Sequence, residues 1–271
     1  MLYLVATPIG NLEDMSFRAI RILKEVSLIA AEDTRHSGKL LKHFEISTPL
    51  ISYHDYSDEN KIRQIIDRLS TEDVALISDA GTPGLSDPGY RLVQAAIKAN
   101  ILITPIPGPA AAIAGLVASG MPTDRFIFLG FLPRQLVKRQ SALQGVALLT
   151  CTLIVYESPH RLLALLDDIM TVLGDRPVVV CREISKMYEE FWRGNAGEAA
   201  KHFSLEPVRG EVTLIIGGAS EDDQIIWDDT ALVNALEEAI ASGLSKKDAA
   251  AHVSAMSGQK KREVYQLSLT L

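Results

Sequence analysis

The chain has 271 residues, of which 47% are hydrophobic and 23% are charged. This length and composition suit a protein with one or two packed cores and exclude an intrinsically disordered chain. The 27 Lys and Arg residues against 34 Asp and Glu residues give a net charge of −7, so any nucleic-acid contact has to be local. Because no apolar run is long enough for a bilayer and the opening residues lack a basic leader, we expect a cytoplasmic protein with no membrane contact.

Short apolar runs alternate with amphipathic ones along the first hundred residues. Strands are predicted at 2–7, 27–32, 49–53, 74–79 and 101–107, and helices at 16–25, 37–44, 59–69 and 90–99. This alternation favours an α/β domain with a mostly parallel sheet and helices on both faces.

A second cycle of the same kind follows the turn-rich segment 120–125. Strands are predicted at 126–131, 152–158, 177–183, 191–194 and 211–218, with a helix at 161–173. Three short helices are expected after them, at 230–242, 245–257 and 260–269. The resulting division is an N-terminal α/β domain (1–119), a second α/β domain (120–220) and a helical C-terminal subdomain (228–271).

The C-terminal segment is basic on an otherwise acidic chain. From Gly243 to Leu271 it has five basic and two acidic residues, a net charge of +3. Two helices joined by a short turn beside lysines are typical of a helix-turn-helix-like appendage. Both a nucleic-acid-binding element and a small packing or dimerisation cap fit this spacing.

Four loops that follow predicted strands are rich in glycine, proline or charged residues. They are 7–11 (TPIGN), 30–37 (AAEDTRHS), 78–89 (SDAGTPGLSDPG) and 105–115 (PIPGPAAAIAG). Ligands of parallel sheets bind beyond the carboxyl ends of the strands, where these loops lie. None is a phosphate-binding fingerprint. Asp79 and Asp87 would repel an anion and suit ammonium, sulfonium or ribose hydroxyl groups, although each could equally cap a turn.

The motifs TPIGN, AAEDTRHS, SDAGTPGLSDPGY, PIPGPAAAI, FLGFLPR, YESPHRL and GEVTLII, in this order, resemble the bacterial ribosomal RNA small-subunit methyltransferases I. That family belongs to the tetrapyrrole-methylase-like class. The similarity runs from about Leu2 to Gly218, and the tail is also similar. It implies two α/β domains of the tetrapyrrole methylase type with a ligand cleft between them, S-adenosyl-L-methionine as cofactor and a homodimer. It also implies methylation of a cytidine ribose 2′-hydroxyl in 16S ribosomal RNA.

On matching positions the resemblance implies a cofactor site and no metal site. The expected cofactor-binding residues are Pro8, Gly10, Ser78, Asp79, Ala80, Gly81, Thr82, Pro83, Ser86, Asp87, Pro107, Gly108, Pro109, Ala110, Ala111, Tyr156, Val212 and Thr213. Because the sulfonium charge fades in the transition state, a carboxylate against the sulfur would favour the ground state. We therefore expect Asp79 near the polar ends of the cofactor, and the backbone of 107–111 near the methyl group.

The acceptor hydroxyl has to lose a proton, and a positioned base contributes about 10²–10⁴-fold. Glu32 and Asp33 are the candidates, with His160 third. Asp33 could instead pair with Arg35, and His160 could cap the following helix.

Candidate RNA-binding residues are basic and lie in two regions, with a solvated surface as the alternative. They are Arg134, Lys138, Arg139, Arg161, Lys246, Lys247, Lys260, Lys261 and Arg262. Two other functions stay open: a small-molecule, tetrapyrrole-type methyltransferase, and a non-enzymatic nucleic-acid-binding regulator. A nicotinamide oxidoreductase is disfavoured by the missing dinucleotide fingerprint.

Overall fold

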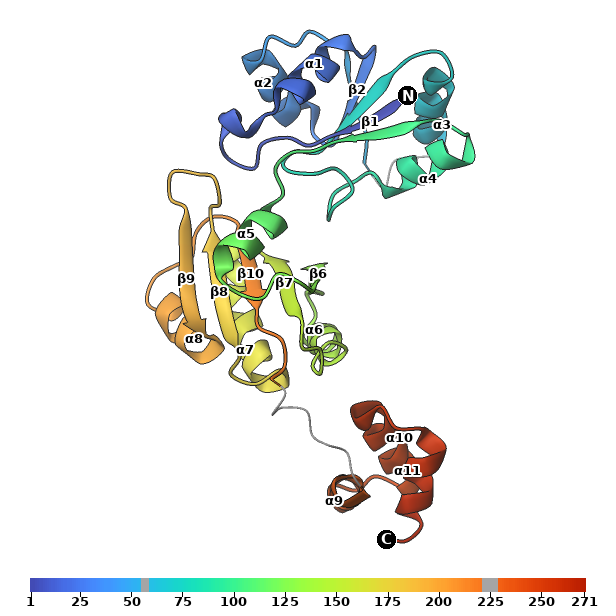
Figure 1. The fold of residues 1–271 in the computed structure, drawn as a ribbon, viewed down its shortest axis with the longest axis vertical. Helices are drawn as coiled ribbons and strands as arrows, with labels where there is room; N and C mark the ends of the chain where they lie inside the picture. Colours follow the sequence, from blue (N-terminus) through green and yellow to red (C-terminus); the bar gives the residue numbers. More distant parts are fainter. Residues whose placement is uncertain (55–58, 221–228) are drawn as a thin grey trace. The chain divides into compact units, whose positions relative to one another are not determined.

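The computed structural model describes residues 1–54, 59–220 and 229–271 (Figure 1). The chain divides into two compact units, Met1–Gly218 and Ala219–Leu271. Within the described ranges, no helix is both long and apolar enough to cross a membrane.

The first half of the larger unit is a five-stranded parallel sheet, as the sequence predicts. The strands β1 (Leu2–Val5), β2 (Leu28–Ala31), β3 (Leu50–Ser52), β4 (Val74–Ile77) and β5 (Ile103–Ile106) have the order β3-β2-β4-β1-β5. Most of their residues are apolar on both sides, because helices cover both faces.

Two helices pack on each face of this sheet (Figure 1). On one face lie α1 (Phe17–Glu25), which follows the 3₁₀ turn η1 (Leu12–Asp14), and α2 (Thr34–His43). On the other face lie α3 (Glu59–Leu69) and α4 (Tyr90–Lys98). Alternate residues of β4 serve the two cores: Ala75 and Ile77 pack toward α1 and α2, while Val74 and Leu76 pack toward α3 and α4.

The second sheet is mostly antiparallel, so the expectation of a mostly parallel sheet was wrong here. The strands β6 (Phe126–Phe131), β7 (Thr152–Glu157), β8 (Pro177–Arg182), β9 (Glu190–Asn195) and β10 (Val212–Ile216) have the order β6-β7-β10-β8-β9. In this sheet β6 and β7 pair in parallel, and the other neighbouring strands are antiparallel. The segment between β8 and β9 is too short for a crossover helix, which a parallel connection would need.

Helices also cover both faces of the second sheet. One face carries α6 (Leu136–Gln144), α7 (Leu162–Val172), which follows η2 (Pro159–Arg161), and α8 (Ala196–Ser204). Neither α6 nor α8 was predicted from the sequence. The opposite face carries α5 (Ala111–Ser119), whose Ala112 and Leu116 are buried against β7, β8 and β10. The predicted division at residue 119 assigns α5 to the N-terminal domain, and in the structure this helix packs on the second sheet.

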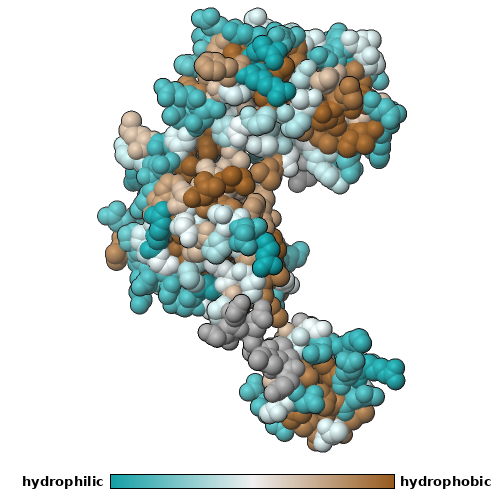
Figure 2. Space-filling model, viewed as in Figure 1, coloured by the Kyte–Doolittle hydropathy of each residue, from teal (hydrophilic) through white to brown (hydrophobic). Residues whose placement is uncertain are grey.

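The outer side of α5 is apolar and exposed. Ile113 and Val117 are 45% and 69% exposed, and a brown patch lies over α5 in Figure 2. A helix that is apolar on all sides is typical of an element buried on all sides.

In the smaller unit, residues 229–271 form three helices, α9 (Asp229–Ala241), α10 (Lys246–Ser257) and α11 (Lys261–Ser268). The predicted ranges agree with these to within a residue or two. Leu236, Val253 and Val264 are fully buried between the helices. Ser245 accepts a hydrogen bond from the Asp248 N–H and caps α10, and Gly258 ends it with a φ of 68°.

Candidate functional site

Three turns at the carboxyl ends of β1, β4 and β5 interlock through their backbones. Thr7 and Gly81 exchange two N–H···O hydrogen bonds of 2.9 and 3.0 Å, and the Thr82 hydroxyl donates to the Pro109 carbonyl at 3.1 Å. Gly81 has a φ of 80°, which favours glycine. A Cβ on Gly108 would lie only 2.8 Å from the Ala6 Cβ, so the third turn needs a glycine to reach β1. The strand order thus brings three sequence segments together in one rigid unit. We call these three bonded turns the platform.

Two further hydrogen bonds attach neighbouring elements to this platform. The Asp79 carboxylate accepts from the backbone N–H of Asp33 at 3.0 Å, which joins the β2–α2 turn to the β4 loop. The Tyr156 hydroxyl accepts from the backbone N–H of Ala112 at 3.0 Å and thereby caps α5, which has no side-chain cap of its own. Tyr156 therefore ties the second sheet to the chain segment that follows β5.

The platform and the second sheet enclose a pocket with a volume of about 460 Å³. That volume is in the range of small-molecule sites in proteins. Its lining is Ile9, Glu32, Asp79, Ala80, Gly81, Thr82, Leu85, Ser86, Asp87, Ala110, Ala111, Phe131, Tyr156, Glu157, Ser158, Pro159, Glu211, Val212 and Thr213.

Most of the residues expected to bind the cofactor line this pocket. They are Asp79, Ala80, Gly81, Thr82, Ser86, Asp87, Ala110, Ala111, Tyr156, Val212 and Thr213. Five others do not line it: the buried Ser78 hydroxyl is bonded within its own loop, and Pro83, Pro107, Gly108 and Pro109 are absent from the lining.

Pro8 and Gly10 face a second hollow instead, beside the pocket. A Cβ on Gly10 would collide with the side-chain stem of Lys186, which comes from the β8–β9 connection. Ser185 in the same connection donates a hydrogen bond to Asp14. Because Gly10 has no side chain, the β8–β9 connection can pack against the turn after β1. This packing explains why a glycine stands at position 10.

Carboxylates dominate the electrostatics of the pocket. Burial, and then the negative charge of Glu32, raise the pKa of Asp87 from 3.8 to about 6. Asp79 and Glu211 add to this rise, while a hydrogen bond from Ser78 opposes it. A pocket lined by five carboxyl groups attracts a cationic ligand and repels an anionic one.

The structure separates the three candidate bases. Glu32 lines the pocket. The Asp33 carboxylate is exposed at the N-terminus of α2, where it accepts from the N–H groups of Arg35 and His36, and these hydrogen bonds hold its pKa below 3.8. His160 is exposed in η2 and is absent from the lining. Among the three, only Glu32 is placed to meet a bound ligand.

Several lining residues were not among the candidates. Leu85 and Phe131 supply apolar walls, and Glu157 and Glu211 add carboxyl groups. Burial raises the pKa of Glu157, whose carboxylate accepts from the Ser158 N–H at 2.7 Å. Glu211 is the first residue of the predicted strand at 211–218, so its position at a strand end was the one available signal.

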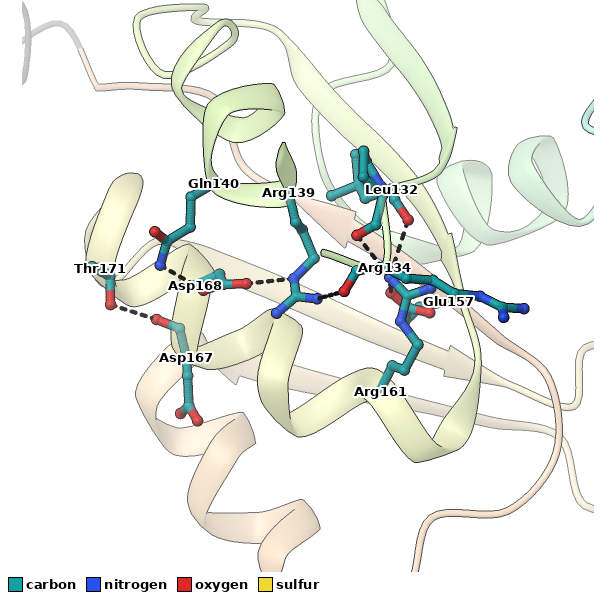
Figure 3. A network of polar contacts seen from close by, with 10 residues as sticks. Leu132, Arg134, Arg139, Gln140, Glu157, Arg161, Asp167, Asp168 and Thr171 are labelled. Carbon is teal, nitrogen blue, oxygen red and sulfur yellow. Dashed lines mark hydrogen bonds and ion pairs between the residues drawn. The ribbon is translucent and has the colours of Figure 1, made fainter. Parts of the chain in front are cut away.

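Two of the candidate RNA-binding arginines make internal contacts (Figure 3). Arg139 of α6 is 6% exposed, and its guanidinium pairs with Asp168 of α7 and donates to the Arg134 carbonyl at 3.1 Å. Arg139 cannot reach a ligand from this position, so its assignment as an RNA contact was wrong. The fold tolerates a buried charge at Arg139 because the facing helix α7 supplies the carboxylate of Asp168.

Arg161 is also engaged within the fold. It pairs with the buried Glu157 at 3.1 Å and donates to the carbonyls of Leu132 and Pro133 at 3.0 and 3.2 Å (Figure 3). These contacts tie the segment after β6 to the end of β7. Arg134 and Lys138 are exposed, as are Lys246, Lys247, Lys260, Lys261 and Arg262 in the smaller unit.

Comparison with known proteins assigns the fold and the family. Residues 1–200 match the Tetrapyrrole (Corrin/Porphyrin) Methylases, and residues 228–271 match the RsmI C-terminal HTH domain. The chain is 49% identical to "Ribosomal RNA small subunit methyltransferase I" of Halalkalibacterium halodurans, over 98% of this chain and 93% of the relative. It is 48% identical to the protein of that name from Synechocystis sp., over 100% of this chain and 98% of the relative.

A solved structure, uroporphyrin-III C-methyl transferase from Thermus thermophilus complexed with S-adenyl homocysteine, has a TM-score of 0.56. It is 20% identical and covers 80% of this chain and 96% of its own, which shows a shared fold. The two sheets and the pocket between them agree with these matches. The chain is a methyltransferase that belongs to the tetrapyrrole methylase family, alongside the proteins named ribosomal RNA small subunit methyltransferase I.

Proposed function

We propose that this enzyme transfers the methyl group of S-adenosyl-L-methionine to the 2′-hydroxyl of a cytidine ribose in 16S ribosomal RNA. The observation that carries the proposal is the pocket between the two sheets, in which backbone turns and carboxyl groups face a space of about 460 Å³. The near full-length identity to proteins named for small-subunit ribosomal RNA supports the choice of acceptor.

The residues present fit this cofactor. Glu32, Asp79, Asp87 and Glu211 give the pocket a negative field, which suits a ligand with an ammonium and a sulfonium group. Ile9, Leu85, Phe131 and Tyr156 offer apolar and aromatic walls for a nucleoside base. We propose the loop 79–87, with Ala110, Ala111, Val212 and Thr213, as the cofactor-binding surface. The cofactor supplies an electrophilic methyl group.

The residues of this chain have two tasks in the reaction. The interlocked turns hold the reactants in line, and orientation of this kind contributes roughly 7–11 kcal/mol to lowering the barrier. A carboxylate has to accept the proton from the ribose hydroxyl. We propose Asp87 for that role, because it lines the pocket and its pKa of about 6 makes it mostly ionised at neutral pH while still basic. Burial, and then the negative charge of Glu32, keep this pKa high.

The acceptor is tested with small ribosomal subunits that lack the modification. Incubation with methyl-labelled S-adenosylmethionine is expected to label the 16S RNA, and nuclease mapping is expected to place the label on a ribose. Label on a base would contradict 2′-O-methylation, and an unlabelled subunit would contradict the ribosomal acceptor. A parallel reaction with tetrapyrroles would reveal the small-molecule alternative.

We propose the smaller unit as an RNA-binding appendage. Lys246, Lys247, Lys260, Lys261 and Arg262 are exposed, and the core of this unit is made by other residues. Replacing these five with Ala is expected to weaken binding of 16S RNA and to reduce the slope of log affinity against log salt by about 0.7 for each phosphate that is no longer neutralised. Circular dichroism checks that the helices persist. Unchanged affinity and slope would identify the unit as a structural cap.

We also propose that the enzyme is a cytoplasmic homodimer. The exposed apolar side of α5 supports this, because Ile113 and Val117 on one protomer can be covered by the same helix of a second. Light scattering is expected to give twice the chain mass of 29.6 kDa. A monomer mass at micromolar concentration would exclude the dimer.

A further inference from the structure

Helix α2 is the most basic of the described helices of the larger unit, and it lies beside the pocket. Its ten residues, Thr34–His43, contain Arg35, Lys39 and Lys42 together with two histidines, and no carboxylate. All five basic side chains are exposed. At 100° per residue, they occupy a continuous arc of about 120° around the helix. The buried Ser37 and Leu41 lie on the other side. We call this arc the α2 basic face.

The stability of the helix does not explain this arrangement. Cations are favoured near the C-terminus of a helix and disfavoured near its N-terminus. Lys42 and His43 in the last turn fit that rule, but Arg35 and His36 stand in the first turn, where acidic residues are favoured. Within residues 1–54, 59–220 and 229–271, neither Lys39 nor Lys42 forms an ion pair.

Gly38 borders the α2 basic face and has no packing reason to be glycine. A Cβ placed on it would have no described atom within 4 Å, and its φ is not positive. Glycine inside a helix weakens the helix. On this face it leaves the backbone open to close approach by another molecule.

The α2 basic face opens into a hollow that adjoins the pocket. His36, Lys39 and His43 line this hollow, and Lys186 reaches it from the β8–β9 connection. The hollow has a volume of about 490 Å³ and shares Ile9, Asp79, Ala80 and Glu211 with the pocket. A chain that follows the basic face therefore arrives at the carboxyl groups where the reaction is proposed to occur.

We propose that the α2 basic face binds the phosphates of the acceptor RNA strand on either side of the methylated nucleotide. This inference rests on the proposed function and adds to it an RNA contact on the catalytic unit itself. The field around the pocket is negative, so a polyanion needs compensating cations close by to bring a ribose hydroxyl to it. Lys39 and Lys42 supply two such charges, and His36 and His43 supply ring N–H donors.

The test uses the full 271-residue protein and an unmodified 16S RNA transcript. The variant Lys39→Ala/Lys42→Ala removes two charges from the basic face. The matched control Lys98→Ala/Lys201→Ala removes two charges from exposed positions on α4 and α8. We expect the first variant to bind RNA at least tenfold more weakly, with a salt slope smaller by about 1.4, and the control to stay within twofold of wild type.

A second measurement separates RNA contact from damage to the pocket. The affinity of the α2 variant for S-adenosylhomocysteine, by calorimetry, is expected to equal that of wild type. If wild-type protein methylates the RNA while the α2 variant and the control bind it equally well, the α2 proposal is overturned and the proposed function stands. If wild type neither binds nor methylates 16S RNA, free or in subunits, the proposed function is overturned and the α2 proposal with it.

Discussion

Replacing Asp87 with Asn is expected to lower the turnover number by a factor of about 10²–10⁴, the usual contribution of a positioned general base. The amide has nearly the shape of the carboxylate, so the pocket lining is preserved while the proton acceptor is lost. Single-turnover methylation of 16S RNA measures the effect. Turnover within threefold of wild type would show that Asp87 is not the base.

Asp33→Asn is the matched control for that variant. Asp33 is also a carboxylate close to the pocket, but it is exposed and caps α2. Asn caps a helix as well as Asp does, so the helix is retained and only the charge changes. We expect turnover within threefold of wild type. A tenfold loss in Asp33→Asn alone would return the catalytic role to Asp33, one of the two residues that the sequence favoured.

The pH dependence gives an independent check on Asp87. A base works when it is deprotonated, so kcat/KM, which reports the free enzyme, is expected to rise with pH through an apparent pKa of about 6. This rise of kcat/KM with pH is expected to be absent from the residual activity of Asp87→Asn.

As the pH rises toward 6, the stability of the fold is expected to fall while the activity rises. Because the folded-state pKa of Asp87 is raised, the stability associated with this group is fully present below pH 3.8 and is lost as pH rises toward 6. A rise of this size corresponds to about 3 kcal/mol at most, and partial solvation reduces it to roughly 1–2 kcal/mol. Above pH 6 the Asn variant should therefore unfold at a higher temperature than wild type, as measured by calorimetry.

The largest loss of stability is expected from Arg139→Met. This change removes the cation from a buried pair and leaves the carboxylate of Asp168, which is 4% exposed, with Gln140 at 2.8 Å as its remaining side-chain partner among the described residues (Figure 3). Breaking a buried ion pair costs about 3–5 kcal/mol. For a unit of this size that lowers the melting temperature by about 6–20 °C.

Two further variants test whether the unpaired buried charge causes this loss of stability. Arg139→Met/Asp168→Leu removes both charges and is expected to regain most of the lost stability, because no unpaired charge then remains. Arg134→Ala removes an exposed guanidinium from the same segment and is expected to change the melting temperature by less than about 2 °C. Equal melting temperatures for wild type and Arg139→Met would contradict the structural role of this pair.

The sequence alone was sufficient for the strands and the parallel pairing of the first sheet, for the loops at the ends of these strands and for the three helices of the tail. These features depend on local patterns: continuous apolar strands between amphipathic helices, and glycine and proline at strand ends. Residues 79–82, 85–87 and 110–111 of these turns line the pocket, because the carboxyl ends of parallel strands meet at one edge.

Tertiary structure decided which charged residues are available for function. By sequence, Arg139 is one of several candidate RNA-binding cations, and only the facing Asp168 makes it a buried structural residue. Asp33 and Glu32 are neighbours in sequence, yet one caps α2 while the other enters the pocket. The strand order of the second sheet and the α2 basic face beside the pocket were likewise outside the reach of local patterns. Burial, pairing and pKa depend on residues distant in the chain, and these become neighbours only when the chain folds.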